Sequence, residues 1–283
     1  MTAFSLLAPA KINLSLKVLG RRDDGYHDLQ SLMVALSVGD RLSFKTQQAT
    51  SLQITCDHPE VPVDDDSLLA RAFRFAAGRL DYAGGLEIHL EKQIPIGAGL
   101  GGGSSDAAAV MQAVARLTGR TLPADAYPEI AHQLGADIPF FLAGGSQWME
   151  GIGERLSPCR VPSDLSVLLV NPGISVSTKS VYEGLPPRLT QSRPPATFPP
   201  SLETTEVLLP YVINDLESVV QAQYPVIATL KERLLELGAD AALMSGSGST
   251  VFGLYSQKKN CDGAVDALRS VYPQMWIEAT SIL

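Results

Sequence analysis

Five glycines occupy seven consecutive positions of this chain, from Gly97 to Gly103, and two serines follow them directly. Backbone without side chains can approach a ligand closely, and N–H groups gathered at the start of a helix attract an anion. The hydroxyls of Ser104 and Ser105 add donors, and either could face a Mg²⁺ ion bound to phosphate. We therefore predict that an oligophosphate binds to the stretch formed by Pro95, Ile96, Gly97, Ala98, Gly99, Leu100, Gly101, Gly102, Gly103, Ser104 and Ser105. A merely flexible loop is the alternative, although flexibility alone does not require so dense a run of glycine.

The common nucleotide-binding sequences do not explain this stretch. Residues 97–102 match the pattern G-x-G-x-x-G, but the acidic residue expected about 20 positions later, at the end of a second strand, is missing because a helix and a turn are predicted there. The P-loop pattern requires lysine where Ser104 stands, and the chain has neither the HRD nor the DFG sequence of protein kinases. The loop therefore belongs to another class of phosphate-binding sequence.

Hydrophobic periodicity predicts the elements that position the loop. Polar and apolar residues alternate over 11–18, which indicates a strand with one polar face. Further strands are expected over 41–56 and 85–95, and helices over 64–80 and 105–119, the last of which ends at Gly119. Residues 126–145 predict a shorter helix that ends near Gly135, followed by an apolar turn that carries Asp137.

The pattern restarts after residue 163. Strands are predicted over 166–173, in two short pieces of 241–255 and over 275–282; helices are predicted over 214–239, with a break near Pro225, and over 263–273. Seven of the 19 prolines lie between residues 186 and 210, which indicates an exposed connection. Because the elements alternate without a long series of parallel βαβ units, we predict an α+β fold in two domains, 1–157 and 158–283.

Composition excludes several classes of function. Twenty-two Lys and Arg against 30 Asp and Glu give a net charge of −8, which argues against a nucleic-acid partner. No apolar run approaches the roughly 18–20 residues of a membrane span, and the first residues do not resemble a signal peptide. Three cysteines lie far apart without pairing, as in a cytoplasmic protein, and the four histidines lack metal-ligand spacing. We expect a cytosolic protein that is a monomer or a weak homodimer.

Three segments, in order, resemble the motifs of the GHMP kinases, the superfamily of galactokinase, homoserine kinase and mevalonate kinase. They are residues 8–16 (APAKINLSL), residues 95–108 (PIGAGLGGGSSDAA) and residues 244–255 (MSGSGSTVFGLY). The resemblance implies a ribosomal-S5-like N-terminal domain and a ferredoxin-like C-terminal domain with the site between them. It also implies that the central loop surrounds the phosphates of ATP, with Mg²⁺ as cofactor.

The expanded loop and the Gly25-Tyr26-His27 sequence resemble one branch of this superfamily. That branch phosphorylates the 2-hydroxyl of a cytidine-diphosphate-linked tetritol on the non-mevalonate route to isoprenoid precursors, which makes a small molecule with a cytidine diphosphate the expected partner. Another kinase of the homoserine or mevalonate type is one alternative. A nucleotide-binding module without catalysis is the other.

The resemblance implies that Asp137 accepts the proton of the attacking hydroxyl and that Lys11 is its partner. The neighbours of Asp137 are largely apolar, so an ionised carboxylate there would need a nearby cation. The alternatives are an Asp137 that caps a turn before Pro139 and a Lys11 that is solvated on its strand. The period of two places Asn13 on the same face as Lys11, where it could bind the substrate or meet water.

The other expected contacts of the two ligands also come from the resemblance. Tyr26 would be one wall of a cytosine slot, His27 would bind the base, and Tyr182, one helical turn after Thr178, would be the opposite wall. In the third motif Gly246 and Gly248 would approach the substrate diphosphate or the phosphate loop, although a tight hairpin would also require them. Ser67 stands where relatives often have an asparagine at adenine, and Lys92 is expected either at the nucleotide or on the surface.

Overall fold

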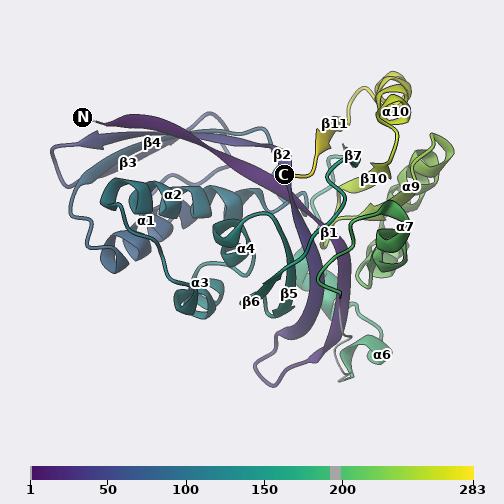
Figure 1. Cartoon of the computed structure of the whole chain (residues 1–283), viewed down its shortest axis with the longest axis horizontal. Helices are drawn as coiled ribbons and strands as arrows, with labels where there is room; N and C mark the ends of the chain where they lie inside the picture. Colours follow the sequence, from purple (N-terminus) through teal and green to yellow (C-terminus); the bar gives the residue numbers. More distant parts are fainter. Residues whose placement is uncertain (1, 192–198) are drawn as a thin grey trace. The chain divides into compact units, whose positions relative to one another are not determined.

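The computed structural model describes residues 2–191 and 199–283, and contacts within the chain divide it into two compact units (Figure 1). Unit 1 consists of Met1–Ala10, Val38–Ile94 and Gly101–Gly144. Unit 2 consists of Lys11–Ser37, Pro95–Leu100 and Gly145–Leu283. Each unit is thus assembled from separate segments. The domain boundary predicted at 157–158 lies inside unit 2 and remains a prediction.

The strands of unit 1 follow the order β3-β4-β2-β1. Strands β1 (Ala3–Arg21) and β2 (His27–Gln47) are long, and only the first part of β1 and the last part of β2 belong to this unit. β2 pairs antiparallel with β4 (Gly85–Glu91), and β3 (Leu52–Cys56) pairs parallel with β4. The single strand predicted over 41–56 is therefore two strands separated by a turn.

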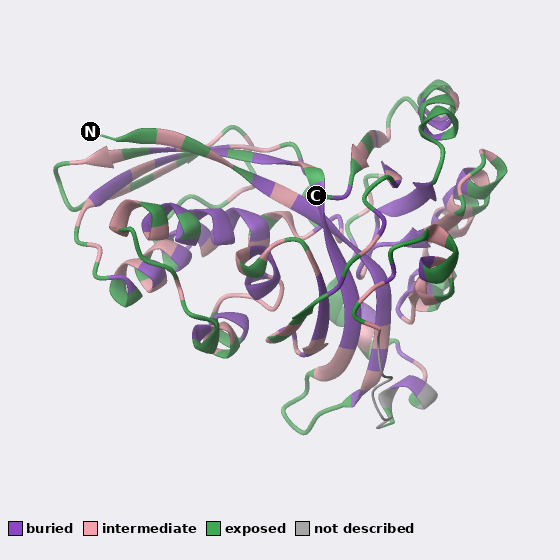
Figure 2. Ribbon diagram, viewed as in Figure 1, coloured by how far each residue is buried: buried purple, intermediate pink, exposed green. Residues whose placement is uncertain are grey.

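Helices α1 (Leu68–Arg79) and α2 (Gly102–Thr118) pack together along one side of these strands (Figure 1). α2 is buried without interruption from Ser105 to Met111, because its first half consists largely of alanine and other small residues (Figure 2). It ends, as predicted, at Gly119, which has a left-handed conformation. The helix is therefore held in the interior of the unit from Ser105 onward, whereas Gly103 in its first turn is exposed.

After α3 (Tyr127–Gln133) the chain turns and forms α4 (Ile138–Ala143). The prediction of an apolar turn here was wrong, because Pro139 lies in the first turn of a short helix, where proline is tolerated. Asp137 is the N-cap residue of α4, and α4 packs against α2.

The C-terminal part of unit 2 contains the antiparallel sheet β11-β7-β10-β9. In chain order, the four strands of this sheet and the helices packed on them follow β-α-β-β-α-β, which is the ferredoxin-like topology that the resemblance implied. Helices α9 and α10 pack on the sheet through Leu230, Leu234 and Leu268. The elements are β7 (Ser166–Asn171), α8 (Glu217–Gln223), α9 (Val226–Glu236), β9 (Ala241–Met244), β10 (Val251–Tyr255), α10 (Lys258–Val271) and β11 (Trp276–Ser281).

The remaining elements of unit 2 flank the parts of β1 and β2 that belong to it. β8 pairs parallel with β1 at Ser15 and Leu16, and β5 pairs with β2. The proline-rich segment 186–210 is not simply exposed: Leu202 and Leu208 are fully buried, and part of the segment lies outside the described residues. The elements are β5 (Ser146–Gly151), β6 (Arg155–Pro158), α5 (Thr178–Glu183), α6 (Pro187–Thr190), α7 (Thr205–Leu208) and β8 (Ile213–Asn214).

Within the described ranges, none of the helices combines the length and the apolar composition that crossing a membrane would require.

Two helix glycines of unit 1 should respond oppositely to the same substitution. Gly119 has φ +68°, so Gly119→Ala should lower the free energy of unfolding by about 1 kcal/mol through left-handed strain. Gly78 lies inside α1, and a Cβ atom there would have nothing within 4 Å, so Gly78→Ala should raise the free energy of unfolding by about 0.5 kcal/mol. Urea unfolding of both variants measures the two changes in the free energy of unfolding. Changes of the same sign would contradict the conformations assigned to the two glycines.

Candidate active site

The glycine-rich loop has a conformation that other residues rarely adopt. Gly97, Gly99 and Gly101 have φ values of +66°, +76° and +71°. At Gly99 a Cβ atom would also lie 2.3 Å from the carbonyl oxygen of Ser245, far inside van der Waals contact. Glycine is therefore required at position 99 both by the backbone angle and by the neighbouring chain.

Hydrogen bonds within unit 2 hold the loop in place. The N–H of Lys11 donates to the carbonyl oxygen of Leu100 at 2.9 Å, and the N–H of Thr250 donates to that of Ala98 at 3.2 Å. The hydroxyl of Ser245 donates to the carbonyl oxygen of Gly99 at 3.0 Å. The alternative of a merely flexible loop does not fit these bonds, because they join the central motif to both of the other motif segments.

The loop leads into the start of α2 in unit 1. The N-cap residue of this helix is Gly101, so no side chain accepts a hydrogen bond from the first turn, whose N–H groups also carry the positive end of the helix dipole. The space beside Gly103 is open. The hydroxyl of Ser105 is buried without a hydrogen-bond partner among the described residues. These groups can receive an anion.

Lys11 and Asn13 form a buried polar chain on β1. Their exposed fractions are 4% and 2%, and the Lys11 Nζ donates to the Asn13 Oδ1 at 2.7 Å. Asn13 in turn donates to the hydroxyl of Ser31 on β2, at 2.8 Å. The alternatives in which Lys11 is solvated and Asn13 meets water are wrong. Ser31 was not identified from the sequence, since nothing local distinguishes it from other strand serines.

The third motif contacts this polar chain. Gly246 has φ +57°, and a Cβ atom there would lie 3.3 Å from the Lys11 Nζ and 3.4 Å from the Asn13 Oδ1. The side chain of Asn214 donates to the carbonyl oxygens of Met244 and Gly246, both at 2.8 Å. Gly248 also has a positive φ, +83°. Gly246 thus allows the third motif to approach Lys11 and Asn13 closely. The turn between β9 and β10 requires both glycines for their positive φ angles. Asn214 was not identified from the sequence, where its only local signal is its position before an acidic helix start.

The expected base-binding residues lie in unit 2. The rings of His27 and Tyr182 are stacked, with centroids 5.0 Å apart and planes at 26°. Tyr26 is 49% exposed. The His27 Nε2 is buried and lacks a hydrogen-bond partner in the described chain, and burial, with a smaller effect of Arg21, lowers the pKa of His27 below its ordinary 6.5.

Thr178 and Tyr182 lie in α5, one turn apart, as predicted. The Thr178 hydroxyl is hydrogen-bonded to that of Ser247 in the third motif, at 2.8 Å. A cytosine slot walled by Tyr26 and Tyr182 remains a prediction.

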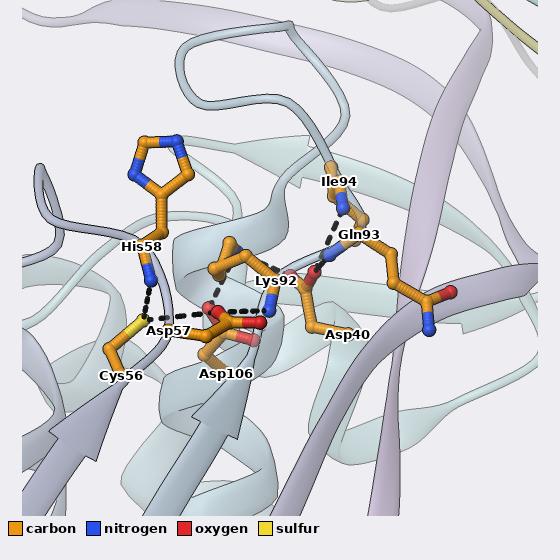
Figure 3. Close-up of polar contacts among 8 residues, drawn as sticks. All are labelled: Asp40, Cys56, Asp57, His58, Lys92, Gln93, Ile94 and Asp106. Atoms are coloured by element: carbon orange, nitrogen blue, oxygen red, sulfur yellow. Dashed lines mark hydrogen bonds and ion pairs between the residues drawn. The ribbon is translucent and has the colours of Figure 1, made fainter.

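Lys92, in unit 1, is not a surface residue. Its side chain is 6% exposed and forms ion pairs with Asp40 and, at 2.9 Å, with Asp106 (Figure 3). Burial lowers the pKa of Lys92, but the two carboxylates outweigh it and the pKa is raised. Burial raises the pKa of Asp106 to about 7 in spite of Lys92, and the charge of Asp40 adds to the rise. Neither aspartate was identified from the sequence.

Ser67 and Asp137 also lie in unit 1. The Ser67 hydroxyl is buried and accepts a hydrogen bond from the N–H of Ala70 at 3.3 Å, so it caps α1 and keeps its own proton and one lone pair for a ligand. The Asp137 carboxylate makes no capping hydrogen bond, which removes the capping alternative. A Cβ atom at Gly135 would lie 3.5 Å from the Ser104 hydroxyl. The turn that carries Asp137 therefore lies beside the first turn of α2.

Two family models match the chain. The GHMP kinases N terminal domain matches residues 67–145, and the GHMP kinases C terminal domain matches residues 207–274. Together these matches include the central loop, Asp137 and the third motif.

Curated relatives match over most of both chains. A 4-diphosphocytidyl-2-C-methyl-D-erythritol kinase of Syntrophotalea carbinolica is 42% identical over 94% of this chain and 94% of its own length. A protein of the same name from Geobacter sp. (strain M21) is 42% identical over 91% of each chain.

Solved structures agree with these matches. The crystal structure of a 4-(cytidine 5'-diphospho)-2C-methyl-D-erythritol kinase, 35% identical, covers 98% of this chain and 99% of its own with a TM-score of 0.79. Homoserine kinase from Cytophaga hutchinsonii has a TM-score of 0.75 over 99% of this chain and 95% of its own, but its 19% identity shows a shared fold alone. On the identity and coverage of its relatives, this chain belongs to the GHMP kinases and, within them, to the family of 4-diphosphocytidyl-2-C-methyl-D-erythritol kinases.

Proposed function

We propose that this protein transfers the γ-phosphate of ATP to the 2-hydroxyl of 4-diphosphocytidyl-2-C-methyl-D-erythritol, a step of the non-mevalonate route to isoprenoid precursors. The observation that carries the proposal is the loop at residues 95–101, whose glycines lead into a helix start without a side-chain cap. Family membership supports the acceptor. The buried Lys11–Asn13 pair beside the third motif supports catalysis rather than binding alone.

In this proposal the N–H groups of the loop and of the first turn of α2 bind the phosphates of ATP. Backbone donors at a helix start are preorganised, so they need little rearrangement as charge moves during transfer. Ser104, Ser105 and Lys92 belong to the same nucleotide-binding part, and Ser67 can donate one hydrogen bond to adenine.

Asp137 is proposed as the acceptor of the proton that leaves the 2-hydroxyl. Lys11 is its partner, as the resemblance implies: a cation favours the ionised carboxylate and can steady charge on the reacting oxygen. The two residues belong to different units, so the support for this pairing is the family resemblance. Because Lys11 is buried and hydrogen-bonded to Asn13, its ammonium is fixed rather than solvated.

Mg²⁺ is the cofactor that the family resemblance implies. The buried Ser105 hydroxyl, which has no partner among the described residues, fits an oxygen ligand for this cation, which prefers oxygen and retains phosphate and water ligands. When bound, Mg²⁺ would neutralise charge on the transferred phosphoryl group.

The acceptor is proposed to bind through unit 2. His27 and Asn13 offer hydrogen bonds, Tyr26 and Tyr182 offer ring faces to cytosine, and Thr178 fixes Tyr182 relative to the third motif. Gly246 and Gly248 would leave room for the diphosphate. A cytoplasmic location and a monomer or weak homodimer complete the proposal; the scattered, unpaired cysteines support the former.

Removal of the proposed base should slow turnover strongly but leave nucleotide binding intact. Asp137→Asn should lower kcat by about 10²- to 10⁴-fold, the usual contribution of a positioned base. ADP release with the cytidyl acceptor measures kcat, and calorimetry measures the Kd of ATP. The matched control is Asp125→Asn, the same change at an exposed aspartate of unit 1. An Asp137→Asn enzyme within a few-fold of wild type would show that another group takes the proton.

The wall of the cytosine slot can be tested at Tyr182. Tyr182→Phe keeps the ring and should leave the acceptor KM nearly unchanged, whereas Tyr182→Leu should raise it about tenfold, because stacking on a base contributes about 1–3 kcal/mol. Cytidine diphosphate should compete with the acceptor in wild type and less well in the leucine variant. If cytidine nucleotides do not compete with the acceptor, a kinase of the homoserine or mevalonate type becomes the better explanation.

The pH dependence of acceptor binding should follow His27. Its lowered pKa means that the imidazole is neutral at pH 7 and gains a proton only below its ordinary value of 6.5. Because protonation removes the acceptor nitrogen, the acceptor KM should be constant from about pH 8 to pH 6.5 and rise below this range. The His27→Gln enzyme should lack this rise. Tighter binding on acidification would instead indicate that a charged His27 pairs with the diphosphate.

A further inference from the structure

One group of buried charges in unit 1 holds both ends of the glycine-rich loop. We call Asp40, Lys92 and Asp106 the loop clamp (Figure 3). Asp40 comes from β2, Lys92 directly follows β4, and Asp106 lies in the first half of α2. The side chains of the two aspartates are 0% and 2% exposed.

Asp40 fixes the residues that enter the loop. Its Oδ1 accepts hydrogen bonds from the backbone N–H groups of Gln93 and Ile94, at 2.6 Å and 2.8 Å. Its Oδ2 accepts one from the Lys92 ammonium. A single carboxylate thus contacts all three residues between the end of β4 and Pro95, where strand pairing no longer determines the path of the chain.

Lys92 connects this entry to the residues that leave the loop. Its ammonium donates to the Asp106 Oδ2 at 2.9 Å. A Cβ atom at Gly102, the first residue of α2, would lie 3.3 Å from the same ammonium. The ammonium therefore lies against the helix start, and the pair with Asp106 sets the distance between the two ends of the loop.

The loop clamp is poorly suited to two simpler roles, direct binding of phosphate and stabilisation of the fold. Two carboxylates against one ammonium do not attract phosphate, and both carboxylates already contact the ammonium. Buried ion pairs also contribute little net stability, because desolvation offsets their attraction. The Asp106 Oδ1 is buried and has no hydrogen-bond partner among the described residues, which adds to the cost.

We propose that Asp40 and Asp106 are positioning residues for ATP, which act through Lys92 to fix the spacing between the two ends of the phosphate loop. This inference rests on the proposed function, in which the loop binds ATP. The N–H groups of the loop and of the first turn of α2 must converge on the phosphates, and convergence requires that residues 94 and 102 stay at a set separation. The loop clamp supplies this constraint.

The test is steady-state kinetics of Asp106→Asn, Lys92→Met and their double variant. Asn has nearly the shape of Asp and cannot ionise. Each single variant should raise the KM of ATP about tenfold, because small misplacements of binding groups have large effects. The kcat at saturating ATP and the KM of the acceptor should change by less than about threefold. The double variant should be no worse than Lys92→Met, because both changes break the same link.

Controls separate positioning from loss of stability and from direct contact. Ile130→Ala removes a buried side chain of α3 in the same unit, and its KM for ATP should equal that of wild type. Additive effects of the two single changes would mean that Lys92 contacts ATP by itself, and a normal KM in folded Asp106→Asn would overturn the proposal. If Asp106→Asn does not fold, Asp40→Asn takes its place, since it keeps an acceptor for Gln93 and Ile94. The same rise in the KM of ATP is expected for it.

The design also separates this inference from the proposed function. A wild-type protein that binds ATP but does not phosphorylate the cytidyl acceptor would contradict the proposed function. Calorimetry of ATP binding to the same variants still tests the loop clamp in that case: a Kd raised about tenfold supports it, and an unchanged Kd overturns it.

Discussion

The close approach of two backbones at Gly99 is the constraint on which the site depends. No side chain fits between this residue and the carbonyl oxygen of Ser245, and the N–H groups of the loop can face a ligand only while the loop keeps its left-handed turns. The loop is bonded on one side to the third motif and on the other to Lys11 of β1. The three family motifs are therefore parts of one packing arrangement, which explains why they occur together.

Each unit supports its share of the site with a buried polar network of a different kind. In unit 2 the chain from Lys11 through Asn13 to Ser31 ends at the carbonyl oxygen of Ser15, so donors and acceptors match in turn. In unit 1 the loop clamp leaves one carboxylate oxygen without a partner among the described residues. Burial of polar groups is costly unless each is paired. The network of unit 2 can be explained by its contribution to stability alone. The loop clamp is better explained by the need of the site for a loop of fixed conformation.

Local signals predicted most of the fold, and long-range contacts account for what was missed. The alternation along β1 and the small residues of α2 are visible in the sequence, and Gly119 and Pro225 mark the helix ends where the structure has them. α4 was missed because Pro139 was interpreted as part of a turn, although proline also suits a first helical turn. The loop was found because its glycines are adjacent in sequence. Asp40 was not found, because it precedes Lys92 by 52 positions and no local pattern connects the two.

The charges of the chain show what kind of attraction can bring ATP to this loop. The protein has a net charge of −8, and Lys92, whose ammonium lies against the start of α2, is already paired with two carboxylates. The loop itself must therefore supply much of the attraction through its N–H groups and the positive end of α2. Such dipoles act over short distances and only in the correct orientation, unlike a free ammonium group. A site of this type depends more on the exact path of its backbone than on the number of its positive charges, which is why buried aspartates that add no attraction for phosphate can still serve it.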